Sequence, residues 1–363
     1  MNRIKTDIWK MLEHVDSFRM QSGLFKTFRA DYSPETCPFD YINESSARVI
    51  ETRYDHAFMT EIIMRLEKHF SSREFFLDVI RKSITPIKNA AVAATVNGAD
   101  VVQWRHYDMK HADGRFILPE IDNTGRCLTA LLEYGKVGRD TLIESIISNE
   151  NNYRQFSSVM SPLNKEFKHA ESGEHSAMMT YFGDKPDNDV DPVCNIAAIT
   201  PVLIFMNEKK YNFDFVGDVG DYLNAFIMSD YASEPFEYYE SPVFFYAYSK
   251  LIEMCKKQLK PKLSSLVVFG DTSERLLELV LNNIKSNGWK NPFEAAMLVT
   301  SMLALGHNGR EVDNGIDMIM HNRRADGLWD AYRFYRQRHP HRIFGSSGLS
   351  TFICLEALHY YFN

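Results

Sequence analysis

The feature that most constrains this chain is helix-period apolar spacing, which recurs along most of its length. Residues three and four apart share one face of a helix, so this spacing predicts amphipathic helices. The spacing predicts helices over residues 56–70, 122–134, 192–206, 218–228, 241–258, 271–284, 292–305, 311–323 and 347–361. One short run, 266–269, predicts the only strand. We therefore expect an all-α fold in one domain, because no Pro-, Gly- or Ser-rich linker divides the 363 residues.

Two segments of the chain repeat one another. Residues 110–116 read Lys-His-Ala-Asp-Gly-Arg-Phe, residues 323–329 read Arg-Arg-Ala-Asp-Gly-Leu-Trp, and an apolar helix follows each. Residues 189–199 have the same loop-to-helix order without the Ala-Asp-Gly turn. Such repetition is typical of helix pairs that pack against their neighbours. We expect a single α/α toroid over residues 1–363, with outer or N-terminal helices in 1–100 and the repeats in 100–363.

Charge and composition argue against several classes of partner and compartment. The net charge of −7 disfavours a nucleic-acid partner, because phosphate binding needs a positive surface. The most apolar stretch, 196–206, is too short to span a bilayer and contains Pro201. The five cysteines are scattered singly, and the first residues are charged. These features predict a protein of the reducing cytoplasm.

Several of these segments resemble the motifs of class II terpene cyclases. The fragment Glu120-Ile-Asp-Asn-Thr124 resembles their Asp-x-Asp-Asp-Thr motif, with Glu and Asn at the two flanking acidic positions. Residues 323–329 are similar to the Gln-x-x-x-Gly-x-Trp repeat, with Arg in place of Gln, and residues 345–358 are similar to the closing inner helix. The likeness covers roughly residues 100–360. The chain has room for one barrel, as in single-barrel prenyltransferase- and cyclase-like proteins.

The resemblance implies an acid chemistry. In the family the middle Asp of the motif is the general acid that protonates an alkene or epoxide, a role that falls here on Asp122. Glu120 and Asn123 take the flanking positions. Such an acid must remain protonated and strongly polarised, which neighbouring acids and hydrogen-bond donors control. The alternative interpretation makes Asp122 the N-cap of its own helix, and one residue can serve both purposes.

The densest acidic segment, residues 184–192, has three interpretations. A calcium loop is disfavoured, because Pro192 stands where that loop needs Gly and Ala198 where it needs a bidentate Glu. In the second interpretation Asp189 and Asp191 lie beside Asp122 as supporting acids, since neighbouring carboxylates raise one another's pKa. In the third they belong to a solvated loop that caps the helix beginning at Pro192. The last two interpretations remain open.

Aromatic and basic residues supply candidates for substrate binding. The 25 Phe, 18 Tyr and 4 Trp residues either line a cavity that stabilises cations or form an ordinary core. The basic segment 333–342 either holds a diphosphate or carboxylate head group or forms a solvated or protein-contact surface. The candidate substrate-binding residues are Trp104, Phe116, Tyr239, Phe245, Trp329, Tyr332, Arg333 and Arg336.

The sequence leaves two hypotheses for function. In the first, the protein is a class II terpene-cyclase-like isomerase or lyase that binds a hydrophobic isoprenoid chain and protonates it from Asp122, assisted by Asp189 or Asp191. No cofactor is expected beyond the magnesium that would accompany a diphosphate substrate. No resident metal is expected either, because the zinc site of protein prenyltransferases and the Asp-Asp-x-x-Asp run are not matched. In the second, a non-catalytic toroid binds a hydrophobic small molecule or a protein partner.

Overall fold

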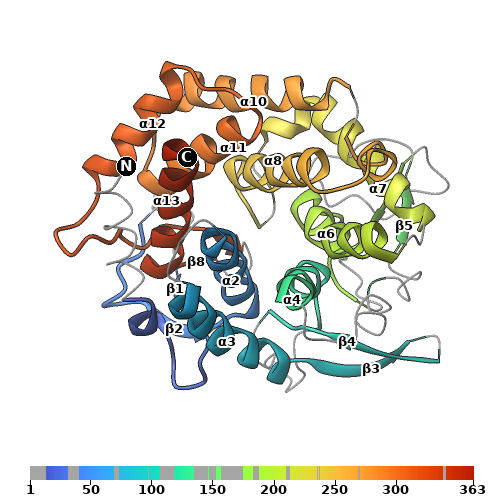
Figure 1. The fold of residues 1–363 in the computed structure, drawn as a ribbon, viewed down its shortest axis with the longest axis horizontal. Helices are drawn as coiled ribbons and strands as arrows, with labels where there is room; N and C mark the ends of the chain where they lie inside the picture. Colours follow the sequence, from blue (N-terminus) through green and yellow to red (C-terminus); the bar gives the residue numbers. More distant parts are fainter. Residues whose placement is uncertain are drawn as a thin grey trace. The chain divides into compact units, whose positions relative to one another are not determined.

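The structure, a computed structural model, is mostly helical and also contains short antiparallel sheets (Figure 1). It describes residues 14–31, 41–68, 73–96, 98–106, 118–134, 146, 153–156, 175–182, 188–209, 213–234, 236, 238–268, 270–337 and 341–363. Within these residues eight strands of three to six residues form three sheets. The all-α prediction is therefore wrong in this respect. Strands this short offer too few side chains for a period-two pattern to stand out against helical spacing.

The chain forms two compact units. Unit 1 holds residues 1–89, 237–246 and 280–363, and unit 2 holds residues 90–236 and 247–279. Helices α8 (Ser241–Lys257) and α10 (Thr272–Asn287) contribute residues to both units. The single-domain organisation over residues 1–363 stays a prediction.

Two buried helices form the centre of unit 1. Its helical elements are η1 (Val15–Phe18), α2 (Arg53–Glu67), α3 (Arg73–Asn89), α11 (Pro292–Ala304), α12 (Arg310–His321) and α13 (Ser347–Phe362). Helices α11 and α13 are buried along most of their length, as expected of helices that are apolar on all sides. Helix α13 packs against both α2 and α11, and α12 packs against α11 (Figure 1).

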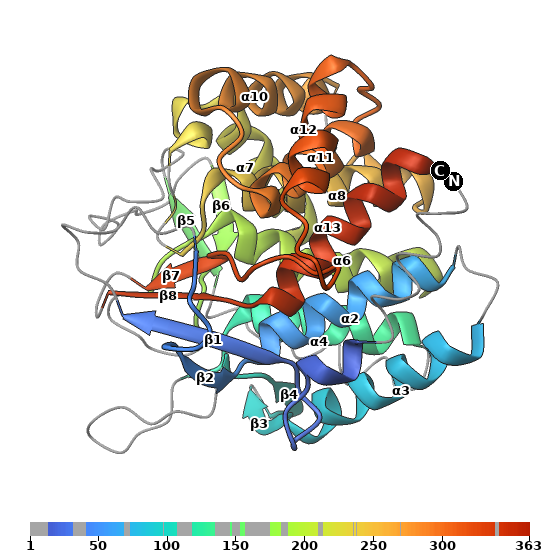
Figure 2. The same ribbon diagram turned by 90° about the vertical axis from the view of Figure 1, so that its left-hand side faces the viewer.

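A four-stranded antiparallel sheet joins the two ends of the chain within unit 1. Its order is β2 (Arg48–Glu51), β1 (Lys26–Asp31), β8 (Arg342–Gly345) and β7 (Tyr335–Gln337). Figure 2 shows β1 beside β8, and their register places Phe28 opposite Gly345. Phe28 and Ile343 point to the same face and pack with Ile42 and Ala331 in a small apolar cluster. Residues 1–100 thus supply strands as well as the helices that were expected there.

Asp55, in the first turn of α2, is fully buried beside this sheet. Its Oδ2 accepts a hydrogen bond of 2.6 Å from the Thr27 hydroxyl in β1. Burial raises the pKa of Asp55 to about 6, although the Thr27 and Thr52 hydroxyls act to lower it. The folded protein therefore binds a proton at Asp55 more tightly than the unfolded chain does.

This bound proton predicts a pH-dependent stability. Because the folded pKa lies above the ordinary value of 3.8, the contribution of Asp55 is fully present below about pH 4 and is lost as pH rises through about 6. The loss amounts to about 3 kcal/mol at pH 8. We expect Asp55→Asn to remove the Asp55 share of the pH dependence in urea unfolding, about 1–2 kcal/mol between pH 5 and 8. The exposed control Asp230→Asn should retain it, and an unchanged pH dependence in Asp55→Asn would contradict the prediction.

Unit 2 is built on a close pair of helices. Its helical elements are α4 (Ile121–Tyr134), α6 (Pro192–Lys209), α7 (Asp214–Met228), η4 (Asp230–Ser233) and α9 (Pro261–Ser264). Two hairpins accompany them, β3 (Val92–Val96) with β4 (Ala99–Gln103) and β5 (Tyr153–Phe156) with β6 (His175–Met178). Helix α4 packs against α6, and α7 packs against α6 and β6 (Figure 1).

The approach of α4 to α6 depends on Gly125. A Cβ at this position would lie 2.2 Å from the Ala197 carbonyl oxygen, far inside van der Waals contact. At Gly217 in α7, the nearest atom to an added Cβ is 3.9 Å away, in the flexible Leu266 side chain. A methyl group at residue 125 therefore requires the α6 backbone to move, whereas one at residue 217 does not.

We expect opposite effects from alanine at these two glycines. Gly125→Ala should lower the free energy of unfolding by about 1–3 kcal/mol, because a methyl group forced into close backbone contact overpacks the helix pair. Gly217→Ala should leave stability unchanged or raise it by up to about 1 kcal/mol, since Ala favours helix over Gly. Chemical denaturation of both variants tests this. Equal stability of the two variants would show that α4 and α6 do not pack this closely.

The structure confirms each predicted helix to within a few residues, corrects one predicted strand and adds a hairpin that was not predicted. The 266–269 strand is wrong, because the Val268 N–H donates to the Ser264 carbonyl and the segment continues the turn that follows α9. The β3–β4 hairpin was not predicted, although Asn97-Gly98 is a strong hairpin-turn signal. Gly98 has a φ of +81°, which such turns require.

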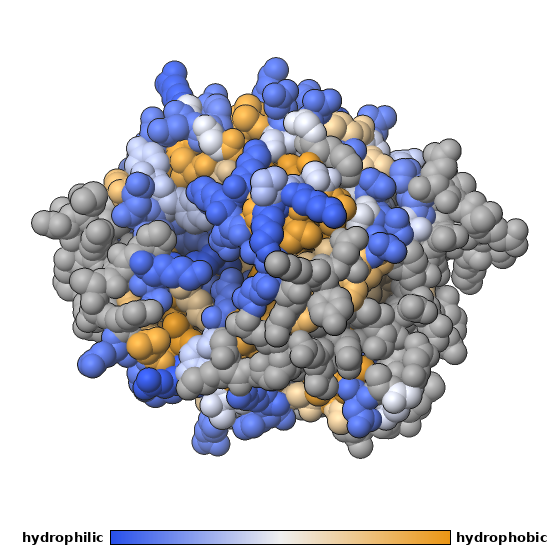
Figure 3. Space-filling view, turned by 45° about the vertical axis from the view of Figure 1, so that its right-hand side comes forward, coloured by the Kyte–Doolittle hydropathy of each residue, from blue (hydrophilic) through white to orange (hydrophobic). Residues whose placement is uncertain are grey.

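Large exposed apolar side chains are scattered over the described residues. They are Tyr41, Val49, Leu118, Met228, Tyr231 and Met320. The face in Figure 3 likewise shows hydrophobic residues in small patches among hydrophilic ones. In the part of the chain that the structure describes, no helix has the length and apolar character to cross a membrane.

Candidate active site

The starts of α4 and α6 carry a group of buried carboxylates in unit 2. Glu120, Asp122 and Asp191 are 9%, 4% and 3% exposed, and Asp189 is half-buried. Carboxylates are rarely this buried unless their charges are compensated or they hold protons. The group contains the acidic residues that the sequence singled out in two separate segments.

Asn123 connects the two carboxylates of its own motif. Its Nδ2 donates to Glu120 Oε2 at 2.5 Å and to Asp122 Oδ1 at 3.0 Å, and its backbone N–H donates to Asp122 Oδ1 at 2.7 Å. An N-cap side chain would instead bind the N–H two or three residues further on. Helix α4 begins at Ile121, so Asp122 lies within its first turn and not at the N-cap position. The two N–H groups of Asn123 polarise the Asp122 carboxyl.

Asp191 is the residue that caps a helix. Its Oδ1 accepts the N–H groups of Val193 at 2.7 Å and Cys194 at 3.2 Å, at the beginning of α6. The pKa of Asp191 is raised to about 8, mainly by burial and also by the nearby Asp189 and Asp122, while the N–H groups of Cys194 and Val193 act to lower it. Asp122 and Asp191 are thus close enough to influence one another. Asp191 therefore caps α6, as one interpretation of this segment proposed, and also lies near Asp122, as the other proposed.

One backbone segment holds both acidic segments in place. The Ile121 N–H donates to the Thr180 carbonyl at 2.8 Å, and the Thr180 N–H donates to the Asp189 carbonyl at 2.8 Å. The Phe182 N–H donates to the Pro119 carbonyl at 3.1 Å, so residues 178–182 lie between the segments that carry Asp122 and Asp191. The distance between the two acids therefore depends on backbone hydrogen bonds and not on flexible side chains alone.

The structure adds three residues that the sequence did not single out. His106 is buried, and its Nδ1 lies 3.7 Å from Glu120 Oε2. Burial raises the pKa of Cys194 and of Tyr222, and the nearby acids raise both further, so the thiol and the phenol stay protonated. A lone His and a Tyr on an apolar helix face carry no distinguishing sequence pattern. Of the three, only Cys194 lies close in the sequence to a predicted site residue, three positions after Asp191.

Trp104 belongs to the framework of this site. Its backbone N–H donates to the Thr124 hydroxyl at 3.0 Å, and its carbonyl accepts from the Glu120 N–H at 3.1 Å. The indole is buried. Trp104 therefore fixes the start of α4 against the end of β4. Phe116 lies outside the described residues, as do the first Ala-Asp-Gly turn and residue 187 of the acidic segment.

The other aromatic candidates lie in unit 1. Tyr239 packs against Tyr54 and Phe334, with ring centroids 6.0 and 5.9 Å apart, and Phe245 is fully buried. Trp329 is also buried, and its Nε1–H donates to the Ile319 carbonyl at 2.8 Å. Tyr332 is half-buried on the ring of Tyr41. The contacts of Tyr239, Phe245 and Trp329 are those of a packed core, whereas Tyr332 lies at the surface.

The two basic candidates share one acidic partner. Arg333 and Arg336 lie 3.1 and 3.0 Å from Glu240 Oε1. In the second Ala-Asp-Gly turn, Arg323 Nε donates to the Gly327 carbonyl at 2.9 Å, as expected of loop chemistry.

The metal-binding potential of the described residues is limited. Among the residues that the structure describes, no three or more His, Cys, Asp or Glu side chains are grouped so that they could hold a metal ion.

Comparisons with known proteins place the fold. No protein-family model and no curated protein sequence matches the chain. A type II terpene cyclase from Scytonema, MstE in its apo form, matches with a TM-score of 0.61 at 10% identity, over 98% of this chain and 97% of that one. The chain has the fold of class II terpene cyclases.

Two further structures extend the comparison. A protein from Actinoplanes matches with a TM-score of 0.57 at 11% identity, over 99% of this chain and 100% of that one. The ent-copalyl diphosphate synthase from Streptomyces platensis matches with a TM-score of 0.51 at 12% identity, over 86% of this chain and 50% of that one. The resemblance to class II terpene cyclases seen in the sequence is therefore confirmed at the level of the fold.

Because the Asn123 amide bridges two carboxylates, its replacement by a carboxylate should make the stability of the protein depend on pH. Asn123→Asp would place a further carboxylate within hydrogen-bond distance of Glu120 and Asp122, and carboxylates this close cannot all ionise. We expect its stability to fall below that of wild type by about 2 kcal/mol at pH 8 and by much less at pH 5. Asn207→Asp is the control, because the Asn207 side chain binds the Gln258 carbonyl and the Lys260 N–H, and it should show no such trend in thermal unfolding. Equal pH trends in the two variants would contradict the bridge.

Proposed function

We propose that this protein is a class II terpene-cyclase-like enzyme that begins the cyclisation of an isoprenoid substrate by protonating a carbon–carbon double bond or an epoxide. The observation that carries the proposal is the buried acid pair of Asp122 and Asp191 in a chain with this fold. Asp122 is the proton donor. For an alkene, the added proton creates a carbocation, the chain closes on it, and loss of a proton from carbon gives a cyclic isomer.

The surroundings of Asp122 suit a strong general acid. Oδ1 of Asp122 accepts two N–H groups from Asn123, which stabilises the carboxylate left after proton transfer. Asp191, with its pKa raised to about 8, remains largely protonated at neutral pH. We assign to Asp191 the role of holding a proton beside Asp122 between turnovers. Glu120 and Asp189 add to the local negative charge that keeps a proton in the group.

The substrate-binding part of the proposal concerns aromatic and basic side chains. Among the aromatic candidates, Trp104 lies in the same unit as the acids, and an aromatic face stabilises a carbocation through the same quadrupole attraction that binds ammonium ions. Guanidinium groups such as those of Arg333 and Arg336, which lie beside Glu240 in unit 1, can bind an anionic head group such as a carboxylate or a diphosphate through paired hydrogen bonds. With a diphosphate substrate, magnesium would enter with the substrate.

Product analysis in heavy water tests the proposal. Purified protein is incubated in D₂O with prenyl diphosphates, free polyprenols and meroterpenoid precursors, with and without magnesium. We expect one of them to give a cyclic product that carries one deuterium on carbon, because the donated proton exchanges with solvent. Asp122→Asn should lose this product by at least about a thousandfold, since an amide cannot supply an acidic proton.

Other outcomes would reject parts of the proposal. Turnover of the same substrate by Asp122→Asn would exclude Asp122 as the donor. A product without deuterium, formed with release of diphosphate, would indicate ionisation in place of protonation. If no member of the panel is converted, and a hydrophobic ligand co-purifies unchanged, the binding role replaces the enzymatic one.

A further inference from the structure

Two buried asparagines flank the segment that carries Asp189 and Asp191. Asn195 is fully buried, and its Oδ1 accepts the Met178 N–H at 2.9 Å while its Nδ2 donates to the Met178 carbonyl at 2.9 Å. The same Nδ2 also donates to the Asp191 carbonyl at 2.9 Å. A single amide thus binds both backbone groups of one residue and the backbone of the capping acid.

Asn188 makes the same kind of contact at the other end of the segment. It is 5% exposed, its Oδ1 accepts the Tyr181 N–H at 2.8 Å, and its Nδ2 donates to the Tyr181 carbonyl at 2.7 Å. Each amide therefore pairs with a residue as a neighbouring β-strand would. Because Met178 and Tyr181 flank Thr180, the two asparagines bind both ends of the segment that also holds Ile121.

We propose that Asn188 and Asn195 are the positioning residues of the acid pair, and that they set the separation of Asp122 and Asp191 through the shared segment 178–181. This inference rests on the proposed function, because it assigns to both residues a role in that chemistry. Neither asparagine touches the reacting carboxyl groups.

An uncharged amide is the group that this role requires. An amide supplies a donor and an acceptor together, which a leucine or a carboxylate at the same position does not. An amide also carries no charge, whereas a Lys or Arg in its place would favour ionised carboxylates and release the proton that the pair must retain. The two asparagines therefore fix geometry without altering the balance of charge around Asp122 and Asp191.

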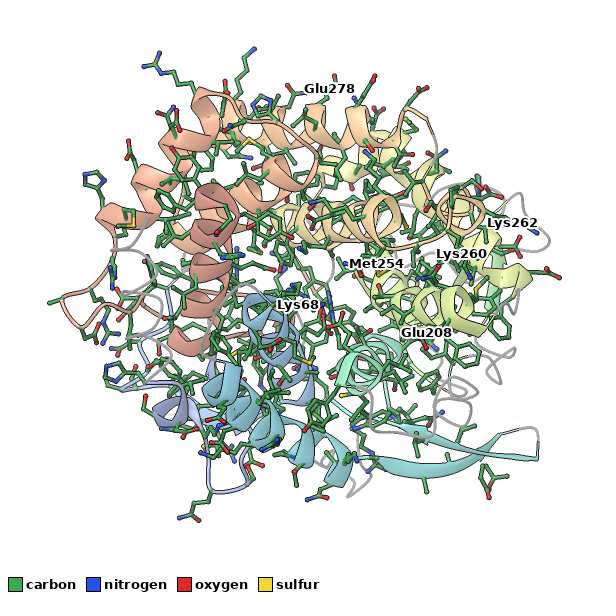
Figure 4. The ribbon with its side chains drawn as sticks, in the orientation of Figure 1. Lys68, Glu208, Met254, Lys260, Lys262 and Glu278 are labelled. Atoms are coloured by element: carbon green, nitrogen blue, oxygen red, sulfur yellow. The ribbon has the colours of Figure 1, made fainter. Side chains whose placement is uncertain are left out.

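A titration of Asp191 tests the proposal without any substrate. The protein is labelled with ¹³C at the Asp carboxyl carbons, and the Asp191 signal is assigned by its loss in Asp191→Asn. We compare wild type with Asn188→Ala and with Asn195→Ser, a second variant that keeps a small polar side chain. The matched control is Asn207→Ala. Asn207 is also a unit 2 asparagine, near the C-terminal end of α6. Its Oδ1 accepts the N–H of Lys260, which is labelled in Figure 4, at 3.0 Å.

We expect the pKa of Asp191 to fall by about one unit or more in each folded variant, because a loosened segment admits water to the carboxyl group. Asn207→Ala should leave the titration unchanged. If either Asn188→Ala or Asn195→Ser folds and Asp191 still titrates as in wild type, the positioning role is wrong. The result does not depend on turnover, so it can fail while the cyclase proposal stands.

Once a substrate is known, a second measurement separates positioning from binding. In the folded variants we expect kcat to fall and its pH profile to shift, while KM stays within about twofold of wild type. Unchanged kcat with a raised KM would assign the asparagines to substrate binding and overturn the proposal.

Discussion

Carboxylates that share a dry site compete for ionisation, because each negative charge raises the cost of the next. Unit 2 places such a set at the adjoining starts of α4 and α6. The arrangement follows from Gly125, whose missing side chain lets the α4 backbone approach the Ala197 carbonyl of α6. It also follows from the hydrogen bonds of residues 178–182 to both acidic segments. Burial then raises the pKa of Asp191, and a site that retains a proton at neutral pH results.

His56 and the Arg65–Glu356 pair in unit 1 have a different character from the acids of unit 2. His56 accepts the Phe25 N–H through Nδ1 and lies 2.8 Å from the Ser83 carbonyl through Nε2, so it is held as a neutral ring. Burial accordingly lowers the pKa of His56 to about 3. Arg65 and Glu356 form an ion pair of 2.7 Å, which the Tyr246 hydroxyl joins. These groups are bound within hydrogen-bond networks that favour one protonation state, as expected of structural interactions.

Much of the helical framework could be predicted from sequence, because amphipathic spacing depends on residues close along the chain. Helices α6, α8, α11 and α13 were found nearly to the residue, since Pro, Ser or Asn marks their starts. The sheet that pairs β1 with β8 was not found, because its strands are short and lie at opposite ends of the chain. The β3–β4 hairpin is a different case, because the sequence between its strands does contain the Asn-Gly signal of a tight turn.

The acidic residues of the site could be proposed from sequence, but their relations could not. Asp122 and Asp191 lie in separate segments, and no local pattern shows that residues 178–182 connect them. The bridging role of Asn123 depends on side-chain geometry that a degraded motif does not reveal. His106 and Tyr222 were missed for the same reason, since each approaches the acids only through the fold.

The central claim is that the pair of Asp122 and Asp191 keeps a proton at neutral pH. Infrared difference spectroscopy of Asp191→Asn against wild type at pH 7 tests this claim most directly, because a protonated carboxyl has a C=O stretch that a carboxylate lacks. We expect a protonated-carboxyl band in wild type that shifts in D₂O and is lost in the variant. A wild-type spectrum without that band at pH 7 would show that the buried acids are all ionised, and it would contradict the account.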